Sequence, residues 1–221
     1  MSSLTFTLFG LAMLNMGCTT DFDGDGLTSD RDCDDQDPDV GYDLFEGTLD
    51  SDWETFCAEA TCLREIHGDL LLSEATQADV DSLSCLGAVK GHLEIHSNEA
   101  IRNLNALENL ETVEGWLELH GKGPKTLEGL RGLREVGVLH LYHSPAKTLD
   151  GLENLTTVTA KLQISYASML NDVSALHTLE LVDGDFAVIG NQSLCPSSVE
   201  KLMESIPEIT GSISVHTNEC E

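Results

Sequence analysis

The chain has 221 residues, and its 39 acidic side chains against 11 basic ones give a formal net charge of −28. Phosphate would be repelled by this charge, so nucleic-acid binding is excluded as a first hypothesis, and direct contact with anionic lipid is disfavoured. A basic or metal-bridged partner is easier to accommodate, and the length suits one domain with a tail.

The chain begins with an apolar leader. Residues 4–17 are almost wholly apolar, are too few to span a bilayer, and end at a small residue directly before Cys18. This pattern is typical of a secretory signal. The end of the leader, Met16-Gly17-Cys18, resembles a bacterial lipobox, whose cysteine is lipidated. We therefore expect a signal peptide over residues 1–17 and lipidation of Cys18. Secretion without a lipid and a buried apolar segment are the alternatives.

An acidic segment follows, with nine aspartates between Asp21 and Asp39. Neighbouring carboxylates repel each other by roughly 0.6 kcal/mol even in water, which favours an extended spacer unless a cation binds. The spacing matches the start of an EF-hand-type loop, in which alternate carboxylates converge on one hard cation. The segment also resembles the Asp-rich calcium repeats of thrombospondin type 3. The predicted Ca²⁺ ligands are Asp21, Asp23, Asp25, Leu27, Ser29, Asp30, Asp32 and Asp34.

The rest of the chain repeats one short pattern, in which a small residue precedes a strict alternation of polar and apolar residues. The copies begin at Gly68, Gly91, Gly115, Gly137, Ala160, Gly184 and Gly211, at spacings of 23, 24, 22, 23, 24 and 27 residues. Alternation is typical of a half-buried strand, and one strand per repeat predicts parallel stacking. A fixed period near 23 predicts a solenoid of about seven rungs.

In the central copies, each strand is followed by a second apolar pattern with period three, for example Leu104, Leu107, Leu110 and Val113. Period three favours short 3₁₀-like turns over a long α-helix. Asn98, Asn191 and Asn218 each fall seven residues after the small residue, where an asparagine can tie a turn to the backbone of its neighbour. The sequence therefore predicts a mainly β fold with short 3₁₀ or helical turns.

The repeat that starts GHLEIHSNEAIRNLNALENLETVEG, and its successors, resemble the receptor L domain. This is the ligand-binding module of insulin- and EGF-receptor-type ectodomains, and similar domains occur in bacterial surface proteins. The resemblance covers roughly residues 57–221. It implies a right-handed parallel β-solenoid with disulfide-pinned ends. It does not imply hormone binding or kinase signalling.

Six cysteines besides Cys18 form an even set, which favours disulfides in an exported protein. We expect Cys195–Cys220 to close the last rung. The resemblance implies Cys62–Cys85 as a cap on the first rung, which leaves Cys33–Cys57 to tie the acidic segment to the cap. Other pairings stay open, and so does metal ligation by Cys57 and Cys62, although no CxxC or nearby histidine pair completes a zinc site.

Alignment of the repeats brings outward-facing aromatic and ionisable side chains of adjacent rungs together. An exposed aromatic among polar groups on a solenoid face is typical of a recognition surface. A transition-metal site formed by the histidines and Glu118 is an alternative, as is a polar face that binds nothing. The predicted ligand-binding residues are Trp116, Tyr142, His96, His120, Glu118 and His140.

Catalysis has little support, because no G-x-S-x-G, HExxH or P-loop motif occurs. The aligned pair Glu94 and Glu118 suggests a glycosidase, but repetition explains the pair better. We expect a signal peptide at 1–17, a lipidated calcium-binding linker at 18–52 and a solenoid at 53–221. The sequence thus predicts a monomeric, non-catalytic recognition or adhesion protein for a protein or glycan, anchored by lipid to a bacterial outer membrane or secreted. A purely structural envelope component, or a metal-dependent protein using the histidine and glutamate patch, are the alternatives.

Overall fold

The computed structural model describes residues 42–58, 60 and 62–220, which belong to one compact unit, Tyr42–Glu221. The predicted leader, Cys18, Cys33 and the predicted calcium ligands from Asp21 to Asp34 lie outside these residues. Within the described ranges, no helix has the length and apolar character needed to cross a membrane.

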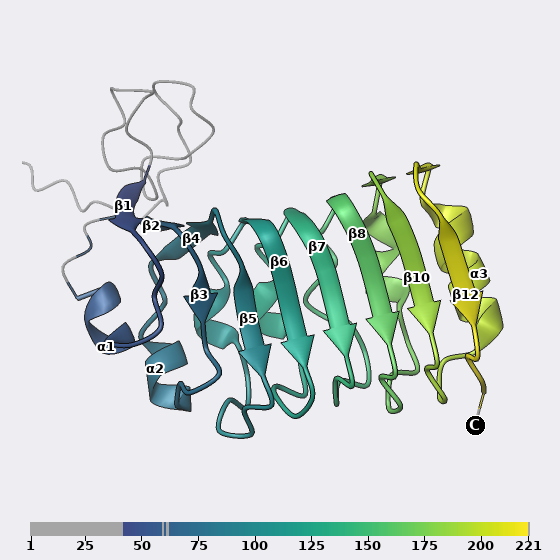
Figure 1. Ribbon diagram of the computed structural model, residues 1–221, viewed down its shortest axis with the longest axis horizontal. Coiled ribbons are helices and arrows are strands. Elements are labelled where there is room, and N and C mark those ends of the chain that lie inside the picture. The colour runs from purple at the N-terminus through teal and green to yellow at the C-terminus, as the bar shows by residue number, and fades with distance from the viewer. Residues whose placement is uncertain (1–41, 59, 61, 221) are drawn as a thin grey trace, which may run out of the picture. The chain divides into compact units, whose positions relative to one another are not determined.

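The unit is a parallel β-solenoid, in which successive strands lie side by side along the long axis (Figure 1). Every pairing between its strands is parallel. The predicted mainly β, parallel solenoid is therefore confirmed. The strands of the described part are β1 (Asp43–Glu46), β2 (Arg64–His67), β3 (Leu70–Leu71), β4 (Leu86–Val89), β5 (Leu93–His96), β6 (Thr112–His120), β7 (Glu135–Tyr142), β8 (Thr157–Ser165), β9 (Leu181–Val182), β10 (Asp185–Ile189), β11 (Glu208–Ile209) and β12 (Ile213–His216).

The strands form two ladders that share β6, β7 and β8. One ladder, which we call the front ladder, runs through β3, β5, the C-terminal halves of β6, β7 and β8, and then β10 and β12. The other runs through β1, β2, β4, the N-terminal halves of the three shared strands, and then β9 and β11. A register shift in each pairing between shared strands bends the backbone from one ladder to the other.

The apolar residues of each repeat stack directly on those of the next. Leu93 pairs with Leu117, Leu117 with Leu139, and Leu139 with Leu162, and all four side chains are fully buried. Burial of a leucine contributes roughly 1.5–3 kcal/mol, so one rung alone cannot offset the entropy lost when about 23 residues are ordered. The core is therefore continuous along the solenoid, and its stability is collective.

The small residue at the start of each repeat is required because adjacent rungs approach closely there. A Cβ atom on Gly137 would lie 2.1 Å from the carbonyl oxygen of Glu114, and one on Gly184 would lie 1.7 Å from that of Ala160. Gly184 also has a φ of +151°, a backbone angle that residues with a side chain rarely adopt. The small residue thus lets the backbone of one rung rest on the next.

Short 3₁₀ turns follow β5, β6 and β8, as the period of three predicts. The three 3₁₀ turns of the described part are η1 (Asn105–Leu107), η2 (Glu128–Leu130) and η3 (Ser174–Thr178), and each buries at least one leucine of the pattern. The α-helices are α1 (Trp53–Phe56), α2 (Gln77–Asp81) and α3 (Pro196–Ser205). In Figure 1, α1 and α2 lie near the N-terminal end of the unit, and α3 lies beside β12 at its C-terminal end.

Buried asparagines tie adjacent rungs together, which confirms the prediction made for them. The Asn98 side-chain amide donates to the carbonyl of Leu72 at 2.8 Å. The Asn191 amide donates to the carbonyl of Ile164 at 3.1 Å and to the Oδ1 atom of Asn218 at 3.0 Å. Each bond spans 26 or 27 residues of sequence and satisfies a polar group that water does not reach.

The disulfides confirm one prediction and correct two. Cys195 is bonded to Cys220, as expected. Cys57 is bonded to Cys85, so the predicted pairs Cys62–Cys85 and Cys33–Cys57 are both wrong. Cys57 directly follows α1, whose Trp53 and Phe56 are buried in the core, and this packing places Cys57 beside Cys85. Cys62 is also disulfide-bonded, so neither Cys57 nor Cys62 is available to a metal.

The two ends of the solenoid differ from expectation. β1 pairs with β2 and Leu49 is buried, so the solenoid starts before residue 53; the acidic composition of this stretch hides its apolar positions. At the other end, the alternation that begins at Gly211 predicts a buried Ile213, but this side chain is 54% exposed. Among the described strands, β12 pairs only with β10, so no further rung covers its other side.

Replacing Asn191 with alanine tests the asparagine bonds. Asn191→Ala removes a donor from the carbonyl of Ile164 in β8 and an acceptor from the N–H of Ala167, and both residues are buried. Each buried group left unpaired costs about 1–3 kcal/mol, so the loss of two partners should lower the free energy of unfolding in urea by about 2–6 kcal/mol. The exposed Asn154, which makes one bond to the Arg131 carbonyl, is the matched control, and Asn154→Ala should cost less than about 1 kcal/mol. Equal losses for the two variants would contradict this role.

Candidate functional site

The front ladder aligns outward-facing side chains in columns, because its strands are parallel and in register. Glu94 pairs with Glu118, and Glu118 with His140. Two residues further along, His96 pairs with His120, and His120 with Tyr142. Paired residues on neighbouring strands are about 4.8 Å apart, so the stacked leucines beneath fix how close these groups lie.

Aromatic and imidazole rings form a continuous series of contacts across this face, which we call the aromatic ridge. Trp116, which is 45% exposed, lies with its ring centroid 5.9 Å from that of His92 and 6.2 Å from that of His140. Tyr142 lies 6.0 Å from His140 and 4.9 Å from His120. The ridge residues are His92, Trp116, His120, His140, Tyr142, His143 and Tyr166.

The relative position of Trp116 and Tyr142 in the ridge differs from the prediction. Trp116 and Tyr142 were expected to lie side by side. Trp116 pairs with Val138 at the start of the front ladder, whereas Tyr142 pairs with His120 four residues further along. Trp116 therefore lies in the middle of β6 and Tyr142 at the C-terminal end of β7, and the ring of His140 contacts both.

A backbone hydrogen bond orients the first ring of the ridge. The Trp116 N–H donates to the Nδ1 atom of His92 at 2.9 Å. Nδ1 is therefore the unprotonated nitrogen of this imidazole, and the remaining proton lies on Nε2. The ring that borders Trp116 is thus held in one orientation by the sheet itself.

Glu118 lies at the centre of the ionisable groups. One of its carboxylate oxygens, Oε1, is 3.2 Å from Nδ1 of His140 and 3.6 Å from Nε2 of His96. Its side chain is only 13% exposed, so its charge is weakly screened by water. The structure therefore brings together four of the predicted residues, namely His96, Glu118, His120 and His140.

Burial governs the charge of His140. It lowers the pKa of the imidazole below its ordinary value; Lys161 and His120 act in the same direction, and Glu118 acts against them. A lowered pKa favours the neutral ring at pH 7. His140 therefore contributes to the ridge as a neutral imidazole.

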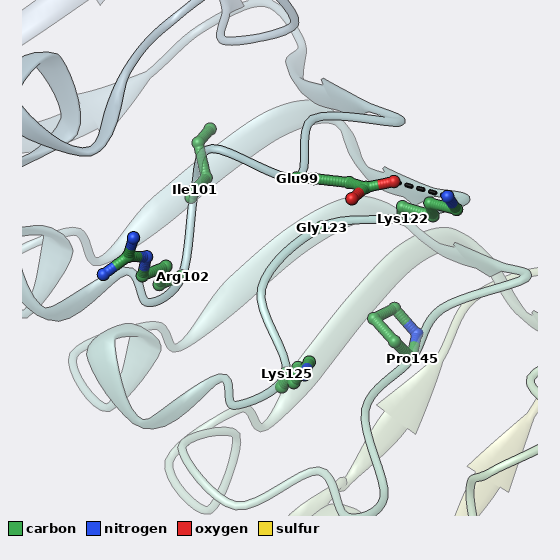
Figure 2. Close-up of a pocket in the computed structure, with 7 residues that line it drawn as sticks. All are labelled: Glu99, Ile101, Arg102, Lys122, Gly123, Lys125 and Pro145. Carbon is green, nitrogen blue, oxygen red and sulfur yellow. Dashed lines mark hydrogen bonds and ion pairs between the residues drawn. The ribbon is translucent and has the colours of Figure 1, made fainter.

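A second feature, a hollow of about 500 Å³, lies among the turns that follow β5, β6 and β7 (Figure 2). Three of its lining residues are basic, in a chain with only 11 lysines and arginines. Glu99 is paired with Lys122, and Arg102 and Lys125 lie further along the turns. The lining residues are Glu99, Ile101, Arg102, Lys122, Gly123, Lys125 and Pro145.

The hollow was not predicted, although the repeat carried a signal for it. Arg102 and Lys125 are 23 residues apart, as are Glu99 and Lys122, so each pair occupies equivalent positions in consecutive rungs. The alternating pattern describes only the strands, whereas these residues lie in the turns that follow them. A concave surface with two basic side chains can accept a small anionic group.

Comparison with known proteins supports the fold derived from the repeat. Residues 61–123 match the family model of the receptor L domain. This segment, which is less than a third of the chain, is similar to the receptor L domain. It includes β2 to β6, and with them His96, Glu118 and His120. No curated protein matches the chain.

The family indicates a role for the solenoid. Receptor L domains are a family of ligand-binding, non-catalytic domains. The matched segment carries the first half of the aromatic ridge, including the exposed Trp116. Ligand binding is therefore the function that the family assigns to this fold.

The charge of His140 can be tested by NMR. In protein stripped of metals, we expect the His140 imidazole to titrate below its ordinary pKa, because burial disfavours the charged ring. Glu118→Gln should lower that pKa further, since the carboxylate is the group that raises it. The folded pKa lies below the unfolded one, so this ring reduces stability as the pH falls through the unfolded value. Titration at or above the ordinary value would contradict the assignment.

Proposed function

We propose that the solenoid is a recognition module that binds a protein or a glycan through the aromatic ridge. The observation that carries this proposal is the exposure of Trp116, at 45%, on a front ladder whose other large apolar residues are mostly buried. Exposing an indole to water is unfavourable, so an exposed tryptophan among polar groups favours a binding surface. Tryptophan and tyrosine are also the residues that most often dominate binding energy.

The rigidity of the sheet supports the same role. Trp116 and Tyr142 stand on strands that are hydrogen-bonded on both sides, since β6 pairs with β5 and β7, and β7 pairs with β6 and β8. Side chains on such a support lose little further entropy when a partner binds. The ridge is therefore preorganised, so little conformational entropy is lost when its side chains contact a partner.

Charge narrows the chemistry of the partner. Glu94 and Glu118 lie beside the ridge, and the chain as a whole has a formal charge of −28. A basic protein surface would be attracted electrostatically to this negative charge. A neutral glycan could stack its sugar rings on the indole without electrostatic repulsion. A strongly acidic partner is disfavoured.

Alanine variants of the ridge test this function. Trp116→Ala and Tyr142→Ala should each weaken partner capture by about tenfold or more, because each removes an aromatic anchor of roughly 1.4 kcal/mol or greater. Capture is measured by pull-down from envelope and host extracts, followed by affinity measurement with the identified partner. Leu44→Ala is the matched control, since Leu44 is 51% exposed on β1, outside the front ladder.

The result separates recognition from a purely structural role. Loss of capture in the ridge variants, with Leu44→Ala unchanged and all three folded, supports the module proposed. Capture that survives both ridge substitutions would favour a structural envelope component whose front ladder binds nothing specific.

We further propose that the protein is exported and anchored by a lipid on Cys18, with the acidic segment as a calcium-binding spacer. The apolar leader before Cys18 and the alternating aspartates support these two proposals. Disulfides such as Cys57–Cys85 and Cys195–Cys220 are compatible with an oxidising compartment. Both proposals rest on sequence pattern, because the residues concerned lie outside the described part.

Calcium binding can be tested by calorimetry. The full mature chain should release or absorb heat on titration with millimolar Ca²⁺, because extracellular calcium modules bind in roughly the 0.1–1 mM range. Replacement of Asp21, Asp23 and Asp25 by asparagine should abolish that heat, since three converging charges are lost. The control replaces the exposed Asp50, Asp81 and Asp150 by asparagine and should leave the heat unchanged. No heat from the unmodified chain at millimolar Ca²⁺ would end the proposal.

A further inference from the structure

A buried histidine nitrogen on the front ladder has no hydrogen-bond partner. Nε2 of His96 is shielded from water and unpaired, although it lies 3.6 Å from Oε1 of Glu118 and 3.8 Å from Oε2 of Glu94. Both distances are too long for a hydrogen bond. Unpaired polar atoms in a buried setting are rare and costly, and an absent ion is one of their established causes.

We propose that His96, Glu118 and His120 form a binding site for Zn²⁺ or a chemically similar transition-metal ion. One ligand atom from each residue lies within 4.8 Å of the other two. His96 belongs to β5, and Glu118 and His120 to β6. The site therefore spans two paired strands, and its geometry follows from the register that pairs His96 with His120.

The distances suit a metal after small side-chain movements. Ligand atoms around tetrahedral Zn²⁺, at about 2.0–2.1 Å from the metal, lie about 3.3 Å from one another. The ligand atoms lie within 4.8 Å of one another, so the remaining gap is about 1.5 Å, which is of the size that side-chain rotation can close. Zn²⁺ would give the unpaired Nε2 of His96 the partner that it lacks.

The donor set selects the class of metal. Two imidazoles and one carboxylate favour Zn²⁺, Cu²⁺, Ni²⁺ or Co²⁺, whereas Ca²⁺ and Mg²⁺ take oxygen ligands only. Glu94 and Glu118 place two negative charges beside the site, and a divalent cation offsets both. The site is thus distinct in chemistry from the calcium site proposed for the acidic segment.

Neighbouring residues support the ligands. His140 contacts Oε1 of Glu118 through Nδ1 at 3.2 Å, which orients the carboxylate from the side opposite His96. The ring of Tyr142 packs against that of His120 at 4.9 Å. Outer groups of this kind fix the orientation of metal ligands. Three protein ligands would leave a fourth coordination position for a water molecule.

The test uses the mature full chain, without a polyhistidine tag, after removal of metals with a chelator. Titration with Zn²⁺ in excess Ca²⁺, followed by calorimetry, should give one site per chain. Co²⁺ should give the visible absorption bands of a four-coordinate nitrogen and oxygen site. His96→Ala, Glu118→Gln and His120→Ala should each weaken Zn²⁺ binding by at least about tenfold. The exposed His177 lies outside the site, and His177→Ala is the matched control.

The outcomes decide the proposal in either direction. Failure of the unmodified chain to bind Zn²⁺, or unchanged binding in folded His96→Ala and His120→Ala, would overturn it. If His120→Ala does not fold, the more exposed His96 is tested as His96→Gln, with circular dichroism as the folding control. The measurement needs no partner, so its result is independent of whether the aromatic ridge binds a protein or glycan.

Discussion

The parallel register of the solenoid is the constraint on which the rest of the structure depends. Stacking of Leu93, Leu117 and Leu139 sets the rungs one strand spacing apart, and the backbone hydrogen bonds between them leave little freedom to slide. A slip by one residue would turn every buried leucine toward solvent. The same register holds the outward columns, so the core and the functional face have one structural origin.

This coupling means that the packing of the repeat also sets the positions of the outward-facing side chains. The residues between the stacked leucines point away from the core and contribute little to it. In β5, β6 and β7 they hold imidazoles, carboxylates and aromatic rings, whereas the aligned positions of β10 include Ala187 and Ile189. The side chains of the two proposed binding sites are therefore concentrated in a few rungs. The match of residues 61–123 to the receptor L domain covers the N-terminal part of these rungs.

The sequence predicted the parts of the structure that depend on period. Alternation gave the strands, the period of three gave the 3₁₀ turns, and Asn98 and Asn191 bond to neighbouring rungs as expected. Alignment of the repeats also placed His96 beside His120. The wrong predictions concern the ends of the solenoid, where a rung lacks a neighbour on one side and the repeat does not determine the packing. The partner of Cys57 was set by the packing of α1, which a repeat pattern does not describe.

The site shows the same division. The repeat alone predicts which outward-facing residues of adjacent strands align. It does not predict the unpaired Nε2 of His96 or the low exposure of Glu118, because both result from side-chain packing. The basic hollow near Arg102 and Lys125 lies in turns, whose paths the strand pattern does not fix.

The most direct measurement of the central claim is the set of cross-strand nuclear Overhauser effects between ring protons in metal-free protein. The register predicts contacts from the His96 ring to that of His120, and from His120 to that of Tyr142, since their centroids lie 5.4 and 4.9 Å apart. Their absence, or contacts from His120 to residues that should face the core, would contradict the register and with it both proposed binding sites on the front ladder.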